Sequence, residues 1–474
     1  MKQLLKYFKS KGKLSIRIIA FSFSLSVSTN LFAQHKNATS KPNIIFLLTD
    51  DQRFDALGAM GNNLIRTPNL DKLAQEGILF KNAYVTTSIC CVSRASLLTG
   101  QYESRHHIDD FNTSLSSLAM SQTYPALLKQ AGYTLGFIGK FGVSTKPPEN
   151  LFDFLVNTEE GGKRQPDYII TRKDGSTIHD TDSIGNAIDN FLNQLGNQSP
   201  FCLSVSFKAP HEQDGNPPKY IIQPRYKDLY KYITIPQPLT ADPKYWNQFP
   251  VFFRTDSNFA RQRWKGLFGT SQLFQENVKN YYRLITGVDD IVGKLIKKLQ
   301  QSGIAENTVI IFMGDNGMFL GEHGLEGKWY GYEESIRVPL IIYDPVSSNN
   351  THHKVASQIA LNIDIAPTVL ALAGVSIPTS MQGINLMDVV TGKIPERKQF
   401  FYQHYFLGSP YIPKVEGVVT SRFKYMIYIE HNYEELFDIK NDPHETLNLA
   451  SDPTYKATLE NMRQQYSQLK KAAL

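Results

Sequence analysis

Apolar runs that end in polar residues recur along the chain. The first, NIIFLLTDD, has an unbroken apolar stretch from Ile44 to Leu48, followed by Thr49 and two aspartates. Unbroken runs of this length are typical of strands that are buried on both faces of a sheet. The same pattern predicts further strands at 132–140, 200–211, 308–317 and 337–345.

Helical patterns separate these predicted strands. In TPNLDKLAQEG, Thr67 suits a cap, Pro68 suits the first helical position and Gly77 suits the end, which predicts a short helix. Residues 275–302 carry apolar side chains at near-helical spacing, and Gly303 follows as a stop. Strands that alternate with helices predict an α/β fold with a large, mainly parallel β-sheet flanked by helices.

The pattern changes near residue 375. The stretch EGVVTSRFKYMIYIEHNYEELFDI predicts short antiparallel strands, and residues 452–472 predict a closing helix. We therefore expect a large α/β domain at 42–374 and a smaller C-terminal α+β subdomain at 375–474.

The N-terminus has a composition of its own. Six basic residues precede an apolar, serine-rich run from Ile18 to Ala33, which is the pattern of a signal peptide with Ala33 as a cleavage residue. A membrane anchor is the alternative, but polar residues interrupt the short run and favour cleavage. We predict a signal peptide at 1–33, a linker at 34–41, and export to the periplasm or the medium without stable membrane insertion.

The net charge of the chain comes mainly from the predicted signal peptide. The 474-residue chain has 50 Lys and Arg against 44 Asp and Glu, and six of the basic residues lie in 1–33, where no acidic residue occurs. The remaining basic and acidic residues are equal in number, so nothing global suggests a nucleic-acid partner. Three cysteines are too few for a disulfide scaffold.

Polar side chains gather where the predicted strands end. In open α/β sheets, ligands bind outside the carboxyl ends of the strands. One crevice is therefore expected to collect Asp50, Asp51, Lys140, His211, Asp315 and Asn316. Three carboxylates and one amide suit a hard divalent cation, Ca²⁺ or Mg²⁺, better than zinc. The alternative is that each acidic pair only caps a helix or makes a turn.

Two of the three cysteines are adjacent, in TTSICCVSRASLLTG at 86–100. SRASLLTG predicts a helix with Cys90 and Cys91 at its N-terminus, a position that favours anions and lowers the pKa of a thiol. Arg94 adds a positive charge that can bind an anionic substrate, so one cysteine is a candidate nucleophile. The alternatives are buried filler or a vicinal disulfide.

The stretch from Cys90 through Arg94 to Thr99 and Gly100 resembles the signature of the type I, formylglycine-dependent sulfatases of the alkaline-phosphatase-like superfamily. The resemblance, to the secreted bacterial polysaccharide type, spans nearly the whole mature chain. It includes NIIFLLTDDQRFDALG, TPNLDKLAQEG, SFKAPH, TVIIFMGDNG, GEHG, GKWYGYEESIRVPLII and ELFDIKNDPHETLNLA. It implies that Cys90 is oxidised to formylglycine (3-oxoalanine) by a maturating enzyme, and that 42–374 is a catalytic sulfatase domain.

The resemblance implies a role for each site residue. The implied metal ligands are Asp50, Asp51, Asp315, Asn316 and the modified Cys90, with Ca²⁺ preferred over Mg²⁺. Arg94 would hold the formylglycine hydrate, Lys140 and Lys328 would bind the sulfate, and His211 would reach the bridging oxygen. His323 is given a supporting place near the substrate.

The implied reaction is attack on sulfur by one hydroxyl of the hydrate, with His211 or Lys328 protonating the leaving oxygen. The second hydroxyl then loses its proton and expels sulfate. Two residues depart from the family pattern. Val92 stands where proline or alanine is usual, and Gly142 stands where a histidine usually contacts the hydrate.

Residues 212–274 are expected to border the crevice mouth and to influence substrate choice. Aromatic and arginine side chains abound there, and most are expected to pack the loop: Tyr226, Tyr230, Trp246, Phe252, Phe253, Arg254, Arg261, Arg263 and Trp264. The histidine pairs 106–107 and 352–353 are taken as core or surface residues.

The expected substrate is a sulfated polysaccharide or its oligosaccharides, algal or glycosaminoglycan. A phosphodiesterase or phosphonate monoester hydrolase of the same fold, and a degenerate protein that only binds sulfated glycans, are the alternatives.

Overall fold

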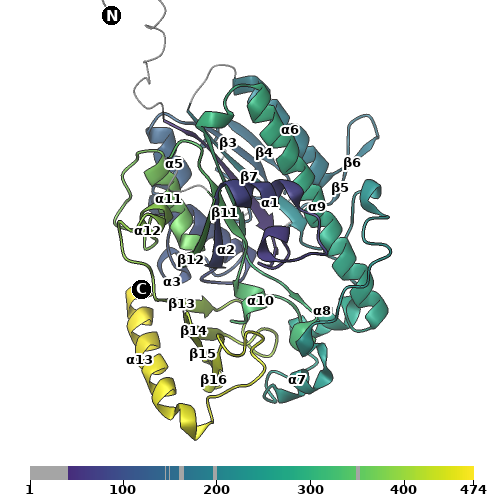
Figure 1. Ribbon diagram of the computed structural model, residues 1–474, viewed down its shortest axis with the longest axis vertical. Helices are drawn as coiled ribbons and strands as arrows, with labels where there is room; N and C mark the ends of the chain where they lie inside the picture. The colour runs from purple at the N-terminus through teal and green to yellow at the C-terminus, as the bar shows by residue number, and fades with distance from the viewer. Residues whose placement is uncertain (1–40, 145, 149, 160–164, 196–199, 348–352) are drawn as a thin grey trace, which may run out of the picture. The chain divides into compact units, whose positions relative to one another are not determined.

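An eight-stranded sheet organises residues 41–474 in the computed structural model, and these residues form one compact unit (Figure 1). The structure describes residues 41–144, 146–148, 150–159, 165–195, 200–347 and 353–474. The predicted signal peptide and all but the last residue of the predicted linker lie outside the described residues. No helix in the described ranges is long and apolar enough to cross a membrane.

The sheet is parallel except for one strand. Its strands, in spatial order, are β12 (Lys354–Leu361), β2 (Ile78–Tyr84), β11 (Leu340–Tyr343), β8 (Thr308–Gly314), β1 (Asn43–Asp50), β7 (Phe201–Pro210), β3 (Thr134–Gly139) and β4 (Phe154–Asn157). Only β11 runs antiparallel to its two neighbours, β2 and β8. The prediction of a large, mainly parallel sheet is confirmed.

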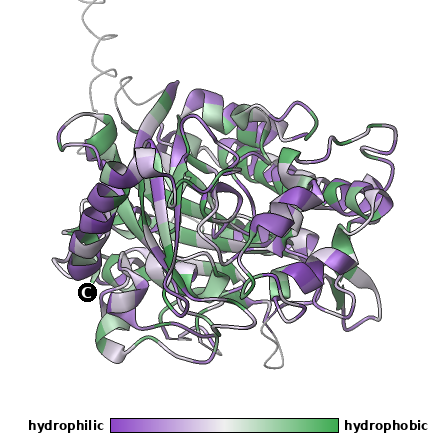
Figure 2. Ribbon diagram, turned by 90° about the horizontal axis from the view of Figure 1, so that it is seen from below, coloured by the Kyte–Doolittle hydropathy of each residue, from purple (hydrophilic) through white to green (hydrophobic). Residues whose placement is uncertain are grey.

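The residues of β1 alternate between two hydrophobic cores. Ile44, Phe46 and Leu48 belong to one core, and Ile45 and Leu47 belong to the other. The first core includes side chains of α2 (Cys90–Thr99), α5 (Tyr124–Gln130) and α11 (Ile365–Leu372). The second includes α1 (Pro68–Glu76), α6 (Asp180–Leu195) and α9 (Ser271–Gln301). Because helices cover both faces of the sheet, every residue of β1 is buried. Figure 2 shows the hydrophobic strands inside more polar helices.

The predicted helices are also present. Thr67 lies at the N-cap of α1, Pro68 is its first residue, and Gly77 follows its last. Helix α9 ends at Gln301, two residues before Gly303. The remaining helices and short strands are α3 (Glu103–His106), α4 (Ser117–Ser121), α7 (Pro243–Gln248), α8 (Phe259–Leu267), α10 (Glu333–Ile336), α12 (Leu386–Val390), β5 (Ile169–Thr171), β6 (Thr177–His179), β9 (Phe319–Leu320) and β10 (Glu326–Gly327).

The C-terminal part is an antiparallel sheet with a helix against it, as predicted. Its strands are β13 (Gln399–His404), β14 (Val415–Thr420), β15 (Phe423–Tyr428) and β16 (Tyr433–Asp438), in that order. Helix α13 (Lys456–Ala473) packs on this sheet through Leu459 and Met462, which contact Val418 and Leu436 in a separate small core.

Buried charges join this sheet to the segment around α10. The Lys424 Nζ atom lies 2.9 Å from Glu333 and 2.8 Å from Glu445, and the Tyr332 hydroxyl donates to Glu435 at 3.1 Å. Burial raises the pKa of Glu435 to about 8 and that of Glu445 to about 7, and the negative charge on neighbouring glutamates adds to both shifts.

Candidate active site

The carboxyl ends of β1 and β8 bring the predicted acidic residues together. The strands pair in parallel with Thr49 opposite Gly314, and the Asp315 amide donates to the Thr49 carbonyl at 2.9 Å. Asp51 follows β1 with a positive φ of 62°, and its amide donates to Asp315 Oδ1 at 3.0 Å. The Asn316 side chain donates to Asp51 Oδ1 at 2.6 Å. The four side chains are buried and form one cluster.

This cluster has the donor set of a hard cation. Ligand atoms of Asp50, Cys90 and Asp315 lie within 4.8 Å of one another. Asp50 Oδ1 and Asn316 Oδ1 are buried and have no hydrogen-bond partner in the described ranges, so two oxygen atoms are left available for a metal. Burial and the nearby charge of Asp50 raise the pKa of Asp315 to about 6, and a bound cation would relieve this repulsion. The residues therefore fit a calcium or magnesium ion.

Cys90 is the first residue of α2, and its side chain faces this cluster. The prediction of a lowered thiol pKa is wrong. Burial raises the pKa of Cys90 to about 11, and the charges of Lys140 and Lys328 offset only part of this shift. The unmodified residue is therefore a neutral thiol near pH 7. All three cysteines are free, which excludes the vicinal disulfide, and Val92 packs in the first core.

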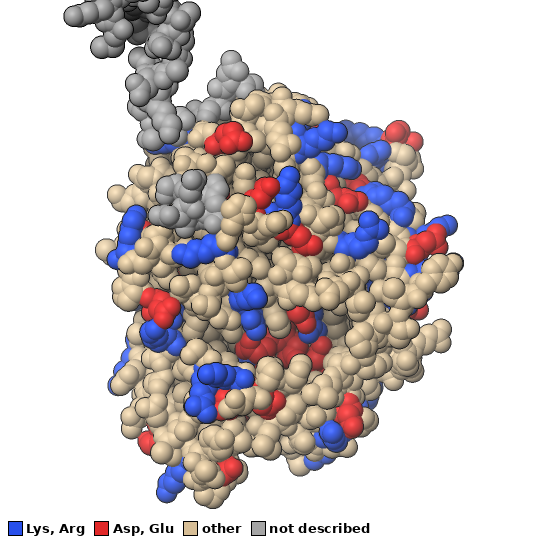
Figure 3. Space-filling model, viewed as in Figure 1, with Lys and Arg blue, Asp and Glu red and all other residues tan. Residues whose placement is uncertain are grey.

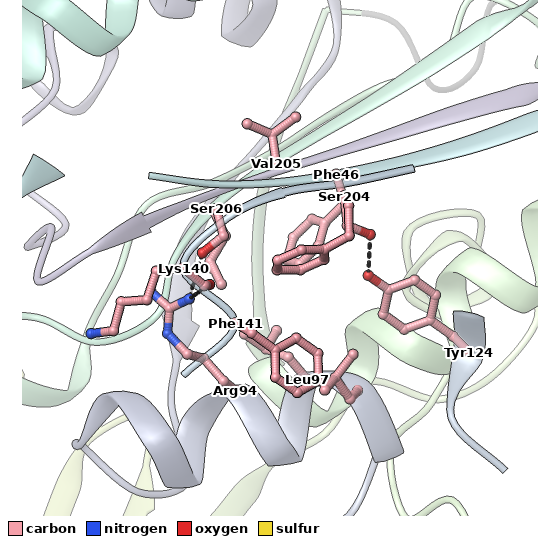
Figure 4. Close-up of a pocket in the computed structure, with 12 residues that line it drawn as sticks. Phe46, Arg94, Leu97, Tyr124, Lys140, Phe141, Ser204, Val205 and Ser206 are labelled. Atoms are coloured by element: carbon pink, nitrogen blue, oxygen red, sulfur yellow. Dashed lines mark hydrogen bonds between the residues drawn. The ribbon is translucent and has the colours of Figure 1, made fainter. Parts of the chain in front are cut away.

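Arg94 extends from α2 to residues that directly follow β8 and β3 and to a residue within β7. Its Nε donates to Asp315 Oδ2 at 2.9 Å, and its Nη1 donates to the Lys140 carbonyl at 2.7 Å and to the Ser206 hydroxyl. Figure 4 shows Arg94 reaching from the helix toward Lys140 and Ser206, beside an apolar interior lined by Phe46 and Phe141. The ion pair with Asp315 is buried on both sides, so this guanidinium is fixed in place.

Two lysines contact the acidic cluster, one at Asp50 and the other at Asp51. Lys140 follows β3, and its Nζ lies 2.5 Å from Asp50 Oδ2. Lys328 follows β10, and its Nζ donates to Asp51 Oδ1. Together with Arg94, these lysines hold the pKa of Asp50 well below its usual range in spite of burial. The site therefore combines carboxylates for a cation with ammonium groups for an anion.

His211 completes the cluster at the end of β7. Its Nε2 lies 3.5 Å from Asp51 Oδ2 and 3.2 Å from the Gln165 side-chain nitrogen. Its Nδ1 lies 2.6 Å from the Glu212 carbonyl oxygen, and the buried Tyr168 hydroxyl donates to the His211 carbonyl at 2.6 Å. A donor at Nδ1 leaves Nε2 as the nitrogen that faces the pocket.

A pocket of about 210 Å³ opens beside these residues. Asp51, Cys90, His211 and Lys328 line it, which unites residues from four separate segments of the sequence. Its lining also includes Phe111, Gln165, Glu212, Asp214, Arg263, Met318, Trp329 and Phe406. The structure thus brings the predicted site residues together.

His323 is the exception. It lines a separate pocket, where it is buried against Tyr332, at a centroid distance of 4.9 Å, and near Tyr245 and Phe249. Burial lowers its pKa to about 3, so it is neutral.

Arg94 leaves no room for a side chain at position 142, which is glycine. Its φ is +70°, and a Cβ atom there would lie 2.6 Å from the Arg94 Cδ atom. A histidine at this position therefore requires Arg94 to move.

Glu159, which the sequence analysis missed, supports the same turn. Its Oε2 accepts the Phe141 amide at 2.8 Å and the Gly142 amide at 3.1 Å. Burial raises the pKa of Glu159, although Lys140 and Arg94 act against the shift. No motif marks this residue, and only the pairing of β3 with β4 brings it to the site.

In the segment 212–274, Arg263 is the arginine that lines the pocket. Its Nε lies 2.5 Å from Glu326 Oε2, and its Nη2 donates to Glu212, so two carboxylates share one guanidinium. Most of the aromatic residues there pack the loop, as expected. Arg261 lies over the rings of Trp246 and Trp264, at 4.5 and 3.8 Å from their centroids.

The three paired histidines that the structure describes, His106, His107 and His353, do not join the site. His106 is buried, with its Nε2 3.0 Å from the Ser96 hydroxyl, and His353 lies 2.7 Å from the Gln75 carbonyl oxygen. His107 is exposed, and His352 lies outside the described residues.

Comparison with known proteins gives a consistent result. The sulfatase family model matches residues 42–375, and the model of the N-sulphoglucosamine sulphohydrolase C-terminal region matches 321–472. An N-acetylglucosamine-6-O-sulfatase of Bacteroides thetaiotaomicron is 30% identical over 89% of this chain and 84% of its own length. An arylsulfatase of Clostridium perfringens is 30% identical over 89% of this chain and 93% of its own length.

A solved structure of a protein with its substrate D-glucosamine-2-N,6-O-disulfate is also similar. It shares 27% identity and a TM-score of 0.79, over 92% of this chain and 98% of that one. The phosphonate monoester hydrolase of Agrobacterium radiobacter, at 21% identity and a TM-score of 0.74 over 91% of this chain and 96% of its own, shares the fold. The chain belongs to the formylglycine-type sulfatase family and is a sulfuric ester hydrolase.

Proposed function

We propose that this enzyme removes sulfate from a sulfated carbohydrate, using a Ca²⁺ ion and a formylglycine made from Cys90. The proposal rests on the convergence of several groups at the carboxyl ends of the central strands. These groups are four oxygen-bearing side chains, together with Cys90, one arginine and two lysines. Because the Cys90 thiol is neutral near pH 7, conversion to an aldehyde hydrate accounts better for a nucleophile here than a thiolate does.

The metal would be held by Asp50, Asp51, Asp315, Asn316 and the modified residue 90. A bound Ca²⁺ would supply charge stabilisation for the sulfate oxygens. Four oxygen-bearing side chains form most of this ligand set and favour Ca²⁺ or Mg²⁺, and we choose Ca²⁺ because it tolerates an irregular coordination geometry.

The remaining side chains have separate roles toward the substrate and the nucleophile. Lys140 and Lys328 bind the non-bridging oxygens of the sulfate, and Arg94 holds the hydrate in place. His211 reaches the bridging oxygen through Nε2 and donates the proton that the leaving alcohol requires. His323 lies apart from the pocket and has no part in this proposal.

The pocket favours a sugar as the leaving group. Phe111, Trp329 and Phe406 offer aromatic surface, and Gln165 and Asp214 offer hydrogen-bonding groups. The two named relatives act on different esters, but the N-acetylglucosamine-6-O-sulfatase and the complex with glucosamine disulfate both point to amino sugars. A sulfated polysaccharide or its oligosaccharides, with a glycosaminoglycan preferred, is the proposed class.

The test is release of sulfate by purified, formylglycine-containing enzyme from a panel of sulfated monosaccharides and oligosaccharides. We expect turnover on at least one sulfated hexosamine, and loss of that turnover in Cys90→Ala. Faster turnover of aryl phosphonate monoesters than of every sulfated sugar would contradict the proposal.

A second test addresses the modification alone. Mass spectrometry of the tryptic peptide that contains residue 90, from protein made in its native host, should show an aldehyde in place of the thiol. Two free thiols at 90 and 91 would overturn the assignment of Cys90 and of its maturating enzyme.

We further propose that residues 1–33 are removed during export, that 34–41 link to a catalytic domain at 42–374, and that 375–474 form its C-terminal subdomain. N-terminal sequencing of the mature protein from the periplasm or medium should begin directly after Ala33. An intact N-terminus in those fractions would contradict the assignment.

A further inference from the structure

Arg263 connects two segments that supply residues to the active-site pocket. It lies on α8, and its side chain, which is 27% exposed, lines the pocket together with His211 and Lys328. Its Nη2 donates to Glu212, the residue after His211. Its Nε lies 2.5 Å from Oε2 of Glu326, which shortly precedes Lys328 in the sequence. One guanidinium thus contacts neighbours of both groups that we propose for the sulfate ester.

The contact between Arg263 and Glu326 has two points, because Arg263 Nη2 also donates to Oε1 of Glu326 at 3.2 Å. A forked guanidinium can make such a paired contact and still reach a second carboxyl group, whereas a lysine ammonium cannot reproduce this geometry. Glu326 belongs to β10 and pairs with Leu320 of β9, so the strand pair fixes its main chain. Arg263 therefore ties the segment after β7 to β10.

Glu212 and Glu326 depend on this guanidinium because both side chains are fully buried. Figure 3 shows other acidic side chains at the surface, with one group in a hollow near the middle of the face it presents. Carboxylates at a surface are hydrated, whereas a buried carboxylate needs a partner within the protein. The position of Glu212 is therefore coupled to that of Arg263.

The ionic part of the contact is the pair of Arg263 and Glu212. Burial acts against ionisation of Glu212, but neighbouring positive charges, that of Arg263 foremost, lower its pKa to about 2. Burial raises the pKa of Glu326 to about 7, although Arg263 acts against the shift. Glu326 still offers an acceptor oxygen when it is protonated. One carboxylate thus balances the charge of Arg263, and Glu326 adds hydrogen bonds.

Glu212 links this contact to His211. His211 Nδ1 lies 2.6 Å from the Glu212 carbonyl oxygen and 3.5 Å from the carboxylate oxygen Oε1. The same Oε1 accepts the hydrogen bond from Arg263. With Nδ1 held in this way, His211 Nε2 lies 3.5 Å from Asp51 Oδ2, on the pocket side of the ring. A displacement of Glu212 would therefore displace the imidazole.

A direct contact between Arg263 and the substrate is the alternative. The edge of the guanidinium that carries Nε and Nη2 is already occupied by Glu212 and Glu326. An anionic group of a substrate would have to compete with two carboxyl groups that are in place before it arrives. The contacts therefore favour a role through neighbouring residues.

We propose that Arg263 is a positioning residue that acts through Glu212 on His211. It holds the Glu212 carboxylate against β10, and Glu212 holds His211 Nδ1, so that Nε2 is presented to the bridging oxygen of the ester. The inference rests on the proposed function, in which the proton moves from Nε2 to the bridging oxygen as the bond between that oxygen and sulfur breaks.

A double-mutant cycle tests this link. Arg263→Lys and His211→Ala are measured singly and together in the calcium-loaded, formylglycine-containing enzyme, on a sulfated hexosamine that the parent hydrolyses. We expect Arg263→Lys to lower kcat about tenfold or more and to leave KM within about twofold, because a misplaced acid acts on the transition state. In the His211→Ala background, the same substitution should lower kcat by less than about threefold, because the group that it positions is gone.

Two results would overturn the inference. Equal fold losses of kcat in the two backgrounds would show a general structural role of Arg263, and a raised KM with unchanged kcat would assign it to substrate binding. Failure of the proposed function is a different observation, since the parent itself then releases no sulfate from any sugar. In that case the same four proteins are compared on the ester that the parent does hydrolyse.

Arg261→Lys is the matched control. It makes the same change on the same helix, at a residue that packs between Trp246 and Trp264, and kcat should stay within about twofold in both backgrounds. If circular dichroism shows that Arg263→Lys does not fold, Glu326→Gln takes its place, because it keeps the side-chain shape and weakens the two-point contact. Its effect on kcat must likewise depend on His211, and an equal loss in both backgrounds would overturn the inference.

Discussion

Arg94 joins four elements at a single point. It lies on α2, and its guanidinium contacts Asp315 after β8, the Lys140 carbonyl after β3 and Ser206 on β7. A lysine in its place keeps the charge but loses the fork of donors that makes these contacts simultaneous.

Arg94→Lys is therefore expected to lower kcat for sulfate release by about 10²–10³-fold, in the range found for loss of one fixed charge-stabilising donor. Steady-state kinetics on a sulfated hexosamine measures the change. Arg422→Lys, where the arginine side chain is 53% exposed, is the control and should keep full activity. If kcat of Arg94→Lys stayed within threefold of the parent value, the activation free energy would have changed by only about 0.7 kcal/mol. That result would show that the forked guanidinium is dispensable.

Glu159 permits a test that separates hydrogen bonding from charge. Glu159→Gln keeps an acceptor for the Phe141 and Gly142 amides, and we expect activity close to the parent's. Glu159→Ala leaves both amides without that acceptor, and an unpaired buried donor costs about 1–3 kcal/mol, which corresponds to about tenfold or more in kcat. Equal losses in the two variants would instead assign the effect to the charge. The pH–rate profiles of both variants complete the comparison.

At the scale of elements, α10 packs against β16 and the segment that follows it through carboxyl groups with raised pKa values. The pKa of Glu435 is raised to about 8 and that of Glu445 to about 7, mainly by burial. At a pH between the ordinary glutamate pKa and these raised values, the folded state therefore holds protons that the unfolded chain has already released. This contribution to stability is complete below about pH 4 and is lost as the pH rises through 7 and 8.

We expect the free energy of unfolding to fall by a few kcal/mol between about pH 5 and pH 9, with Glu435 as a main source. Glu435→Gln, which cannot ionise, should flatten this dependence, as urea unfolding at several pH values would measure. Glu430→Gln, at an exposed position after β15, should keep the slope of the parent. A slope that Glu435→Gln leaves unchanged would contradict the assignment.

The sequence predicted the strands that carry the site, because β1 and β8 are continuous apolar runs that end in acidic residues. It also predicted α2, α9 and the antiparallel C-terminal sheet. It could not find Glu159, which follows the edge strand β4 and reaches the site only through tertiary pairing. Nor could it show that burial outweighs the helix N-terminus at the Cys90 thiol, since that balance depends on the folded surroundings.

Which residue of the segment 212–274 lines the pocket could not be predicted from the sequence, as Arg263 shows. The sequence placed it in a segment of aromatic and basic residues, without separating it from its neighbours Arg261 and Trp264. Only the fold shows that Arg263 pairs with Glu212 and Glu326 at the pocket, while Arg261 packs between two tryptophans.

For the molecule as a whole, the proposed metal should be a folding ligand as well as a catalytic one. Its ligands come from β1, β8 and α2, so bound Ca²⁺ would hold the centre of the sheet to the first helix. A ligand at about 1,000 times its Kd stabilises the folded state by about 4 kcal/mol.

Removal of Ca²⁺ with a chelator is therefore expected to lower the Tm and abolish activity, and added Ca²⁺ should restore both. Differential scanning calorimetry with Ca²⁺, Mg²⁺ or chelator gives the order of preference. The double variant Asp50→Asn, Asp315→Asn should lose the response to Ca²⁺, and its Tm without the ion should also fall, because Lys140 and Arg94 are left buried without their carboxylate partners. A Tm that does not depend on Ca²⁺ would argue against a resident ion.

The burial of Cys90, which is 1% exposed, has a consequence for the proposed modification of this residue. Any enzyme that oxidises this residue has to enclose it, and in the folded chain α2 and the sheet already do so. On the proposed conversion of Cys90, modification would have to precede folding, while the segment is still an extended peptide. A chain that folded first would be a stable but inactive product, so the yield of active enzyme would depend on the relative rates of modification and folding rather than on stability.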